Sequence, residues 1–140
     1  MTDYDIRATL AVQCEETSLN RLCELIGLEP DFKYIRGTKI RPNLPHVHRY
    51  NAWVIRDERH GGVESVSESV AALLARFPFG RDTPPHRLAS AQVALSICVI
   101  GPSDNVEVRI SAALLSEVAA VGGSIFIDAY CASDENDEMG

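Results

Sequence analysis

Two segments of this chain place an apolar side chain at every second position, and this period constrains the fold more than any other feature. Residues 6–12 carry Ile, Ala, Leu and Val in this way, and residues 93–99 carry Val, Leu, Ile and Val. A two-residue period is typical of a β-strand that buries one face. Residues 51–56 predict another strand. The chain is therefore expected to build a sheet against which other elements pack.

Three further segments have the 3.6-residue period of an amphipathic helix, residues 19–26, 65–77 and 111–121. Ser18 is the predicted N-cap of the first helix, and Gly27 fits the left-handed position just past its end. Ser65 and Glu68 have the spacing of a capping box at the start of the second helix. Ser111 is predicted to cap the third helix.

The remaining segments complete an α+β pattern. Residues 33–41 and 125–130 predict two more strands, and a hairpin turn over 101–105 predicts a strand at 106–110. The predicted order is β-α-β-β-α-β-β-α-β. Because each helix has one apolar face and several strands alternate, we expect a mixed, mainly antiparallel sheet with three helices packed on one face.

The domain boundaries follow from the same pattern. Residues 1–132 are predicted to form a single α+β domain, and residues 133–140 an acidic, disordered tail. Turns and loops are expected at 42–48, 57–62 and 78–85, where Gly, Pro and charged residues gather. The four cysteines contain no C-x-x-C pair and are predicted to be reduced packing residues. Without an export signal or a long apolar run, the sequence predicts a cytoplasmic protein with no membrane span.

The charge of the chain is unevenly distributed. Residues 33–56 carry six basic side chains and no Asp or Glu, in a protein with a formal net charge of -7. Subtracting those six positive charges leaves the remainder at -13. Segregated charge of this kind attracts a specific partner, because the local field is strongest where water is partly excluded.

Candidate catalytic and metal sites are weak. His46 and His48 have the spacing that places two rings on one side of an extended segment, but a zinc site needs further ligands, and cationic neighbours oppose a divalent ion. There is no Gly-x-Ser-x-Gly elbow, no Cys beside a His and no phosphate loop. The acidic pairs flank elements where solvated carboxylates are ordinary. The sequence therefore favours a non-enzymatic protein, with no catalytic residue and no cofactor, and leaves an unrecognised enzyme as an alternative.

A set of separated motifs resembles a known family. These are Ile26-Gly27-Leu28-Glu29-Pro30-Asp31, then Arg36-Gly37, then Asn51-Ala52-Trp53-Val54-Ile55, and finally the helix and strand over 114–130. Together they resemble the bacterial domain of unknown function 4279 nearly end to end. The resemblance implies a small cytoplasmic α+β domain. It supplies no activity, cofactor or catalytic residue.

Four interpretations of the basic segment stay open. It is a solvated loop balanced by the acidic remainder, a binding surface for an acidic protein such as a toxin neutralised by an immunity protein, or a small-anion site clamped by Arg36, Arg41 and Arg49. Nucleic acid is the fourth interpretation, and the pI near 5.0 opposes it. The candidate binding residues are Arg36, Lys39, Arg41, Arg49, Tyr50 and Trp53. Trp53 is expected in the core, with a ligand wall as the alternative. The sequence leaves a homodimer open.

Overall fold

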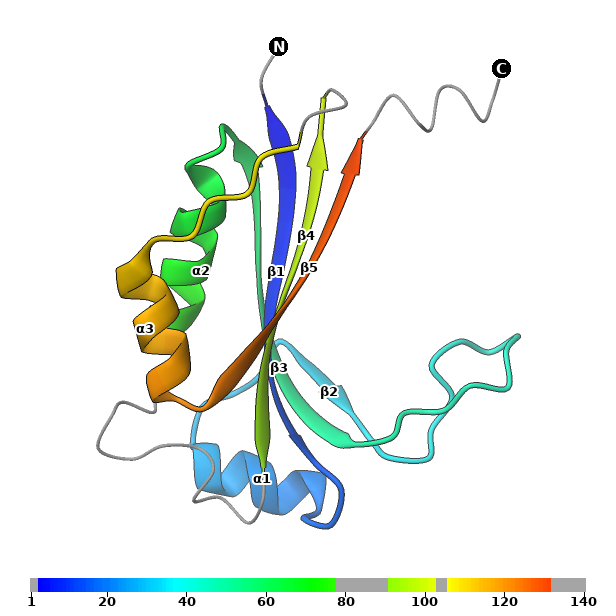
Figure 1. Cartoon of the computed structure of the whole chain (residues 1–140). Helices are drawn as coiled ribbons and strands as arrows, with labels where there is room; N and C mark the ends of the chain where they lie inside the picture. Colours follow the sequence, from blue (N-terminus) through cyan, green and yellow to red (C-terminus); the bar gives the residue numbers. More distant parts are fainter. Residues whose placement is uncertain (1–2, 78–90, 103–105, 132–140) are drawn as a thin grey trace.

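A five-stranded sheet with the order β2-β3-β1-β4-β5 organises the residues that the computed structural model describes, 3–77, 91–102 and 106–131 (Figure 1). The elements are β1 (Tyr4–Cys14), α1 (Leu19–Ile26), β2 (Phe32–Tyr34), β3 (Asn51–Gly61), α2 (Ser65–Arg76), β4 (Gln92–Gly101), α3 (Ala112–Ala120) and β5 (Gly123–Cys131). The predicted α+β class with a mixed, mainly antiparallel sheet and three helices is confirmed. The predicted tail at 133–140 and loop at 78–85 lie outside the described residues.

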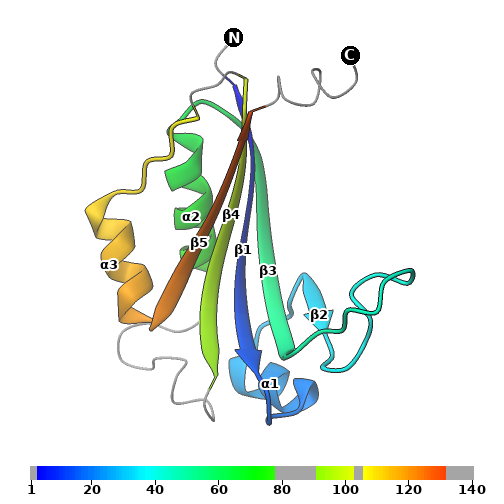
Figure 2. The ribbon, with the colours of Figure 1, turned by 45° about the vertical axis from the view of Figure 1, so that its right-hand side comes forward.

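β1 is the central strand, as its alternating pattern requires. It pairs antiparallel with β3 on one side and with β4 on the other, while β5 pairs parallel with β4. The apolar side chains of β1 other than Ala11 point to one face, which is buried. Figures 1 and 2 show α2 and α3 on this inner face and α1 across one end of the sheet. The opposite, outer face of the sheet carries no helix of the described chain.

The ends of α1 and α3 follow the predicted local chemistry. The Ser18 hydroxyl accepts a hydrogen bond from the Arg21 backbone N–H at 3.2 Å, which satisfies one orphan donor of the first turn. Gly27 adopts the left-handed conformation with φ of 75°, so the lack of a Cβ permits the helix end. Ser111 caps α3 by accepting from the Leu114 backbone N–H at 3.2 Å.

The capping box predicted for α2 is wrong. Glu64, not Ser65, precedes the first helical turn, and it makes no side-chain cap. Ser65 is buried at 8% exposure inside the helix. Glu68 instead lies 3.6 Å from the Arg59 guanidinium on β3. The residues that suggested a capping box therefore have other roles: Ser65 is buried in the helix and Glu68 contacts the sheet.

β3 extends five residues beyond its predicted end, so the predicted turn at 57–62 is wrong. On the inner face, Asp57 accepts a hydrogen bond from the Ser69 hydroxyl of α2 at 2.6 Å and from Arg59 at 2.7 Å. These polar contacts replace the apolar side chains that normally mark a buried strand face. The strand continues because its polar groups are satisfied by α2.

The strand predicted at 106–110 does not form, and the observed order is β-α-β-β-α-β-α-β. The segment is extended without pairing into the sheet. Its alternating residues Val106, Val108 and Ile110 pack partly buried against the core, and the Arg109 carbonyl accepts a hydrogen bond from the Ser67 hydroxyl of α2 at 2.8 Å. The alternation therefore reflects one face turned to the core, not a ladder partner.

Trp53 is fully buried, with 0% of its surface exposed. Its ring packs against Phe77 at the end of α2, with centroids 6.0 Å apart. Its indole N–H donates to the Leu28 carbonyl oxygen at 2.8 Å, just past the end of α1. The core role expected for Trp53 is confirmed, and it connects β3 to both helices.

No helix in the described ranges is long and apolar enough to cross a membrane.

Replacing Trp53 with Phe should lower the free energy of unfolding by about 2 kcal/mol, because the smaller ring leaves a cavity and the Leu28 carbonyl loses its donor. Urea unfolding measures this loss. The control is Ile35→Val, at a position that is 53% exposed, where a change below about 0.5 kcal/mol is expected. Equal losses in the two variants would contradict the role given to Trp53.

Candidate functional site

Residues 35–50 form a two-stranded ribbon that projects from the sheet between β2 and β3, and we call it the arm (Figure 1, right). Backbone hydrogen bonds cross it from Gly37 N–H to the His48 carbonyl at 2.9 Å, from His48 N–H to the Thr38 carbonyl at 2.8 Å, and from Ile40 N–H to the His46 carbonyl at 3.0 Å. Residues 46–48 are therefore paired, and the irregular loop predicted over 42–48 is limited to the tip.

The root of the arm is fixed to the body of the domain by side-chain hydrogen bonds. The Asn51 side chain accepts from the Arg36 backbone N–H and donates to the Thr17 carbonyl, both at 2.9 Å. The Tyr34 and His48 rings stack with centroids 4.5 Å apart. These contacts give the arm a defined direction where it leaves the sheet.

Two of the six basic side chains of residues 33–56 are compensated locally. Lys33 lies 3.6 Å from the Glu29 carboxylate, and Arg56 lies 3.8 Å from that of Glu58. The Arg56 guanidinium also covers the Phe32 ring, 4.1 Å from its centroid. Both residues lie on strands, outside the arm.

The four basic residues of the arm differ from this pair. Arg36, Lys39, Arg41 and Arg49 are exposed and form no ion pair with any residue in the described ranges. The Arg36 guanidinium donates to the Glu15 backbone carbonyl at 3.0 Å, which leaves its charge uncompensated. The arm thus carries four positive charges on an acidic protein.

The arm also exposes apolar side chains, which the sequence analysis did not identify. Ile35 and Ile40 are each 53% exposed, and Leu44 and Val47 are each 43% exposed. Lys39 lies opposite Val47 across the ribbon, so cationic and apolar side chains are immediate neighbours. Ile35, Ile40 and Val47 each stand next to Arg, Lys or His in the sequence, but that pattern alone does not distinguish an exposed side chain from a buried one.

The remaining predicted site residues have other positions. Tyr50 is half-buried at the root of the arm. The complete burial of Trp53 leaves no face of its indole for a ligand, so the alternative interpretation of a binding wall is wrong. His46 and His48 lie on the same strand of the ribbon, and the described chain contains no group of three or more His, Cys, Asp or Glu able to hold a metal ion.

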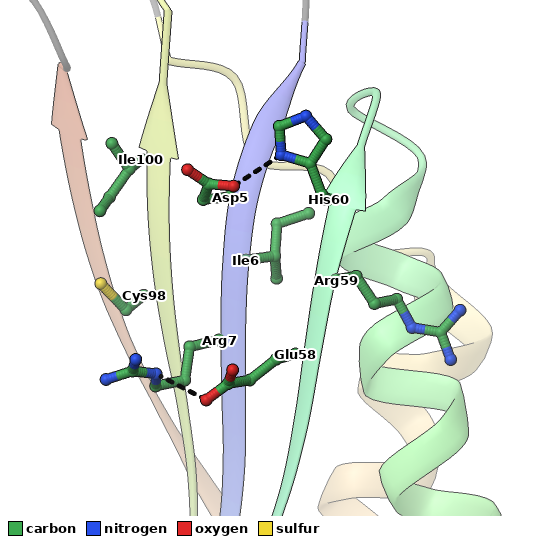
Figure 3. Close-up of a pocket in the computed structure, with 8 residues that line it drawn as sticks. All are labelled: Asp5, Ile6, Arg7, Glu58, Arg59, His60, Cys98 and Ile100. Atoms are coloured by element: carbon green, nitrogen blue, oxygen red, sulfur yellow. Dashed lines mark hydrogen bonds and ion pairs between the residues drawn. The ribbon is translucent and has the colours of Figure 1, made fainter.

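A separate depression of about 550 Å³ lies on the outer face of the sheet, at the far end of β3 from the arm (Figure 3). It is lined by Asp5, Ile6, Arg7, Glu58, Arg59, His60, Cys98 and Ile100. The Asp5 carboxylate lies 2.6 Å from His60 Nδ1, and Arg7 lies 3.2 Å from Glu58. The hydrogen bond to Asp5 raises the pKa of His60 above its ordinary value. This cluster was not predicted from the sequence, because His60 was expected to lie in the turn over 57–62.

The polar groups of the depression pair with one another rather than converge on an open position. Cys98 lies opposite Arg7 on the β4 side of β1, whereas His60 belongs to β3 on the other side. Figure 3 shows the thiol and the imidazole separated by β1. A Cys–His pair for nucleophilic catalysis is therefore not formed here. The arm is the stronger candidate site.

The chain belongs to the DUF4279 family, a domain of unknown function, whose profile matches residues 4–132. This match spans every element of the fold and includes the whole arm. Searches of the curated proteins and of the solved structures returned no match. The family resemblance predicted from the motifs is confirmed.

The Asp31 carboxylate connects the segment before β2 to α2 and β3 near the arm, and the effect of replacing it on stability should be measurable. It accepts from Arg76 Nη1 at 2.9 Å, from Arg76 Nη2 at 3.1 Å and from the Arg56 backbone N–H at 2.8 Å. Asp31→Asn should lower the free energy of unfolding by about 1 kcal/mol at neutral pH, a value reduced by solvent screening of this partly exposed pair. Glu29→Gln, which changes a neighbouring exposed acid, is the control and should have little effect.

The loss of stability in Asp31→Asn should also depend on pH. The hydrogen bonds from Arg76, and then from the Arg56 backbone, hold the pKa of Asp31 below its ordinary value. The stabilisation is therefore complete above about pH 4 and is lost as the pH falls through the lowered folded pKa. Denaturant unfolding of both proteins should show a difference that shrinks below pH 4. A constant difference down to pH 2 would contradict this assignment.

NMR titration of the histidine ring protons should show that His60 loses its proton at a higher pH than an unperturbed histidine. Asp5→Asn should move the pKa of His60 back down, because it removes the hydrogen bond to Nδ1. The contribution of this pair to stability is complete below the ordinary pKa and is lost as the pH rises through the raised folded pKa. Ser96→Ala, on the same face but outside the cluster, should leave the titration unchanged.

Proposed function

We propose that this member of the DUF4279 family is a non-enzymatic interaction module that binds an acidic protein through its arm. One observation carries the proposal: four cationic side chains without a described carboxylate partner share one projecting ribbon with four exposed apolar side chains. Positive charge of this kind attracts and orients an acidic partner, while buried apolar contacts supply affinity. Immunity proteins that neutralise toxins are one example of such modules.

The exposure of the arm favours a protein over a small anion. Small-ligand sites are concave and bury roughly 70–90% of the ligand surface. Arg36, Arg41 and Arg49 are all exposed side chains of a ribbon. A large partner surface can cover such a ribbon, whereas a carboxylate or phosphate would remain in water. The net charge of -7 also opposes a nucleic acid at long range.

The arm is large enough to supply most of one side of a contact between proteins. A standard interface uses roughly 20 to 30 residues a side. The arm spans residues 35–50. The exposed ring of Phe32 and the exposed side chain of Leu28 lie next to its root. A cytoplasmic location is part of this proposal, since Cys23 and Cys98 carry free thiols, as is usual in a reducing compartment.

The proposal is tested by capture from an extract of the source cells with the purified domain as immobilised bait. The double variant Arg41→Glu/Arg49→Glu should lower the recovery of the bound protein at least about tenfold, because it reverses two of the four arm charges. Its matched control is Arg21→Glu/Arg109→Glu. That pair makes the same charge change at exposed arginines outside the arm, each of which already contacts a local Glu.

Wild type and the control should retain the same protein, and its recovery should fall as the salt concentration rises. Ile40→Ser/Leu44→Ser should weaken capture without changing its salt dependence, which separates the apolar contribution from the charges. Recovery that is equal for wild type, the arm variant and the control would refute binding through the arm. Thermal stabilisation by a small organic acid, lost in the arm variant, would favour the anion site instead.

A further inference from the structure

The second edge of the sheet, formed by β5, is long and is not paired by any strand in the part of the chain that the structure describes. β5 spans nine residues and ends the strand order, and no strand of the described chain pairs with its outer side. β2, at the opposite edge, has only three residues, and Lys33 within it is paired with Glu29. Short, charged edge strands are a normal protection against pairing with another chain. β5 is long and has one charged residue, Asp128.

β5 also exposes apolar side chains on both of its faces. Phe126 is 59% and Tyr130 is 55% exposed on the outer face, and Ile127 is 47% exposed on the inner face. Asp128 is the only charged residue of the strand. On α3, next to β5, Leu115 is 44% exposed. An unpaired strand edge with exposed apolar side chains is the kind of surface that proteins cover by association.

The helix layer covers only part of β5. α3 has nine residues and, at 1.5 Å a residue, is about 13 Å long. β5 has the same number of residues but spans about 30 Å at 3.3 Å a residue. α3 connects directly to the start of the strand at Gly123, so it lies beside the first half (Figure 2). The second half, with the exposed Ile127 and Ala129, extends beyond the helix.

We infer that β5 pairs antiparallel with β5 of a second copy of this chain, about a two-fold axis at Ile127, to give a continuous ten-stranded sheet. An axis perpendicular to the sheet keeps the helices of both copies on the same face. Because the two strands run in opposite directions, the partner's α3 comes beside the second half of β5, which this copy's own helix leaves uncovered.

The side-chain pattern selects that register. With Ile127 opposite its counterpart, Ile125 lies opposite Ala129 and Phe126 lies opposite Asp128 of the other copy. The inner face of the junction is then entirely apolar. An axis at Asp128 would place two carboxylates directly opposite each other, which is destabilising. β5 and α3 comprise eighteen residues, nine in each element, just below the roughly 20 to 30 residues of one side of a standard interface.

Sedimentation equilibrium of the full chain should give twice the 15.3 kDa monomer mass at micromolar concentration. Ile127→Lys should raise the dimer dissociation constant at least about a hundredfold, because it buries two like charges opposite each other. The matched control is Ile40→Lys on the arm, which adds the same charge at an equally apolar, 53% exposed position. It should remain a dimer. Circular dichroism should show that both variants are folded.

A disulfide experiment tests the register itself. In a chain with its four native cysteines replaced by Ser, Ile127→Cys should form a linked dimer on mild oxidation, since residues directly opposite have Cβ atoms about 4.5–5.5 Å apart. Ala129→Cys should not, because its counterpart lies four residues away along the strand, about 13 Å.

Three results would overturn the inference. A wild-type monomer up to about 100 µM would mean that the edge is covered within the chain. A dimer that persists in Ile127→Lys but dissociates in Ile40→Lys would place the interface on the arm. Linking through position 129 instead of 127 would exclude the antiparallel register. None of these results depends on whether the arm binds an acidic partner.

Discussion

The contact between the Trp53 indole and the Leu28 carbonyl oxygen is the constraint on which the position of the arm depends. Trp53 is the third residue of β3, close to the point where the arm returns to the sheet. Its N–H reaches Leu28 in the connection that precedes β2, the strand from whose end the arm departs. A fully buried ring in this position fixes both ends of the arm to one core. The arm is irregular at its tip but rigidly based.

The electrostatics of the molecule separate the arm from the rest of the sheet. On the strands, opposite charges meet across neighbouring positions, as with Arg7 and Glu58, so those charges are largely balanced. The cations of the arm extend away from these acids, and in the described chain none of them forms an ion pair. Their field therefore extends into the solvent less attenuated than that of the paired charges. The arm therefore differs from the strands in the pairing of its charges within the described chain, rather than in their number.

Local chemistry explains which elements the sequence predicts. Ser18 and Gly27 define α1 through backbone requirements that do not depend on the rest of the fold, and the alternation in β1 and β4 follows from a single buried face. The errors arise where a distant element satisfies the local pattern. The spacing of Ser65 and Glu68 mimics a cap, but Arg59 of β3 takes the carboxylate.

The same reason limits prediction of the site. The basic character of the arm is visible in the sequence, but its pairing into a ribbon requires hydrogen bonds between residues such as Thr38 and His48, about ten positions apart. The exposure of Ile40 and Leu44 is equally hidden, because apolar residues between strands are usually assumed to be buried. Only the three-dimensional arrangement shows whether apolar residues without a helix or strand periodicity are exposed on a surface or buried in the core.

The two proposed surfaces lie at opposite edges of one sheet, and this separation has a consequence for binding. A dimer joined through β5 would carry its two arms at the outer edges, beyond β2 of each copy. Nine inter-strand spacings of about 4.8 Å separate the two β2 strands by about 43 Å, so the arms lie at least that far apart. Neither arm would obstruct the junction, so partner binding and self-association would be thermodynamically independent for a monovalent partner. A partner with two acidic surfaces at that spacing would instead bind both arms, and the second contact would form at a high effective concentration. Dimerisation would then raise the apparent affinity of the arm without changing any residue in it.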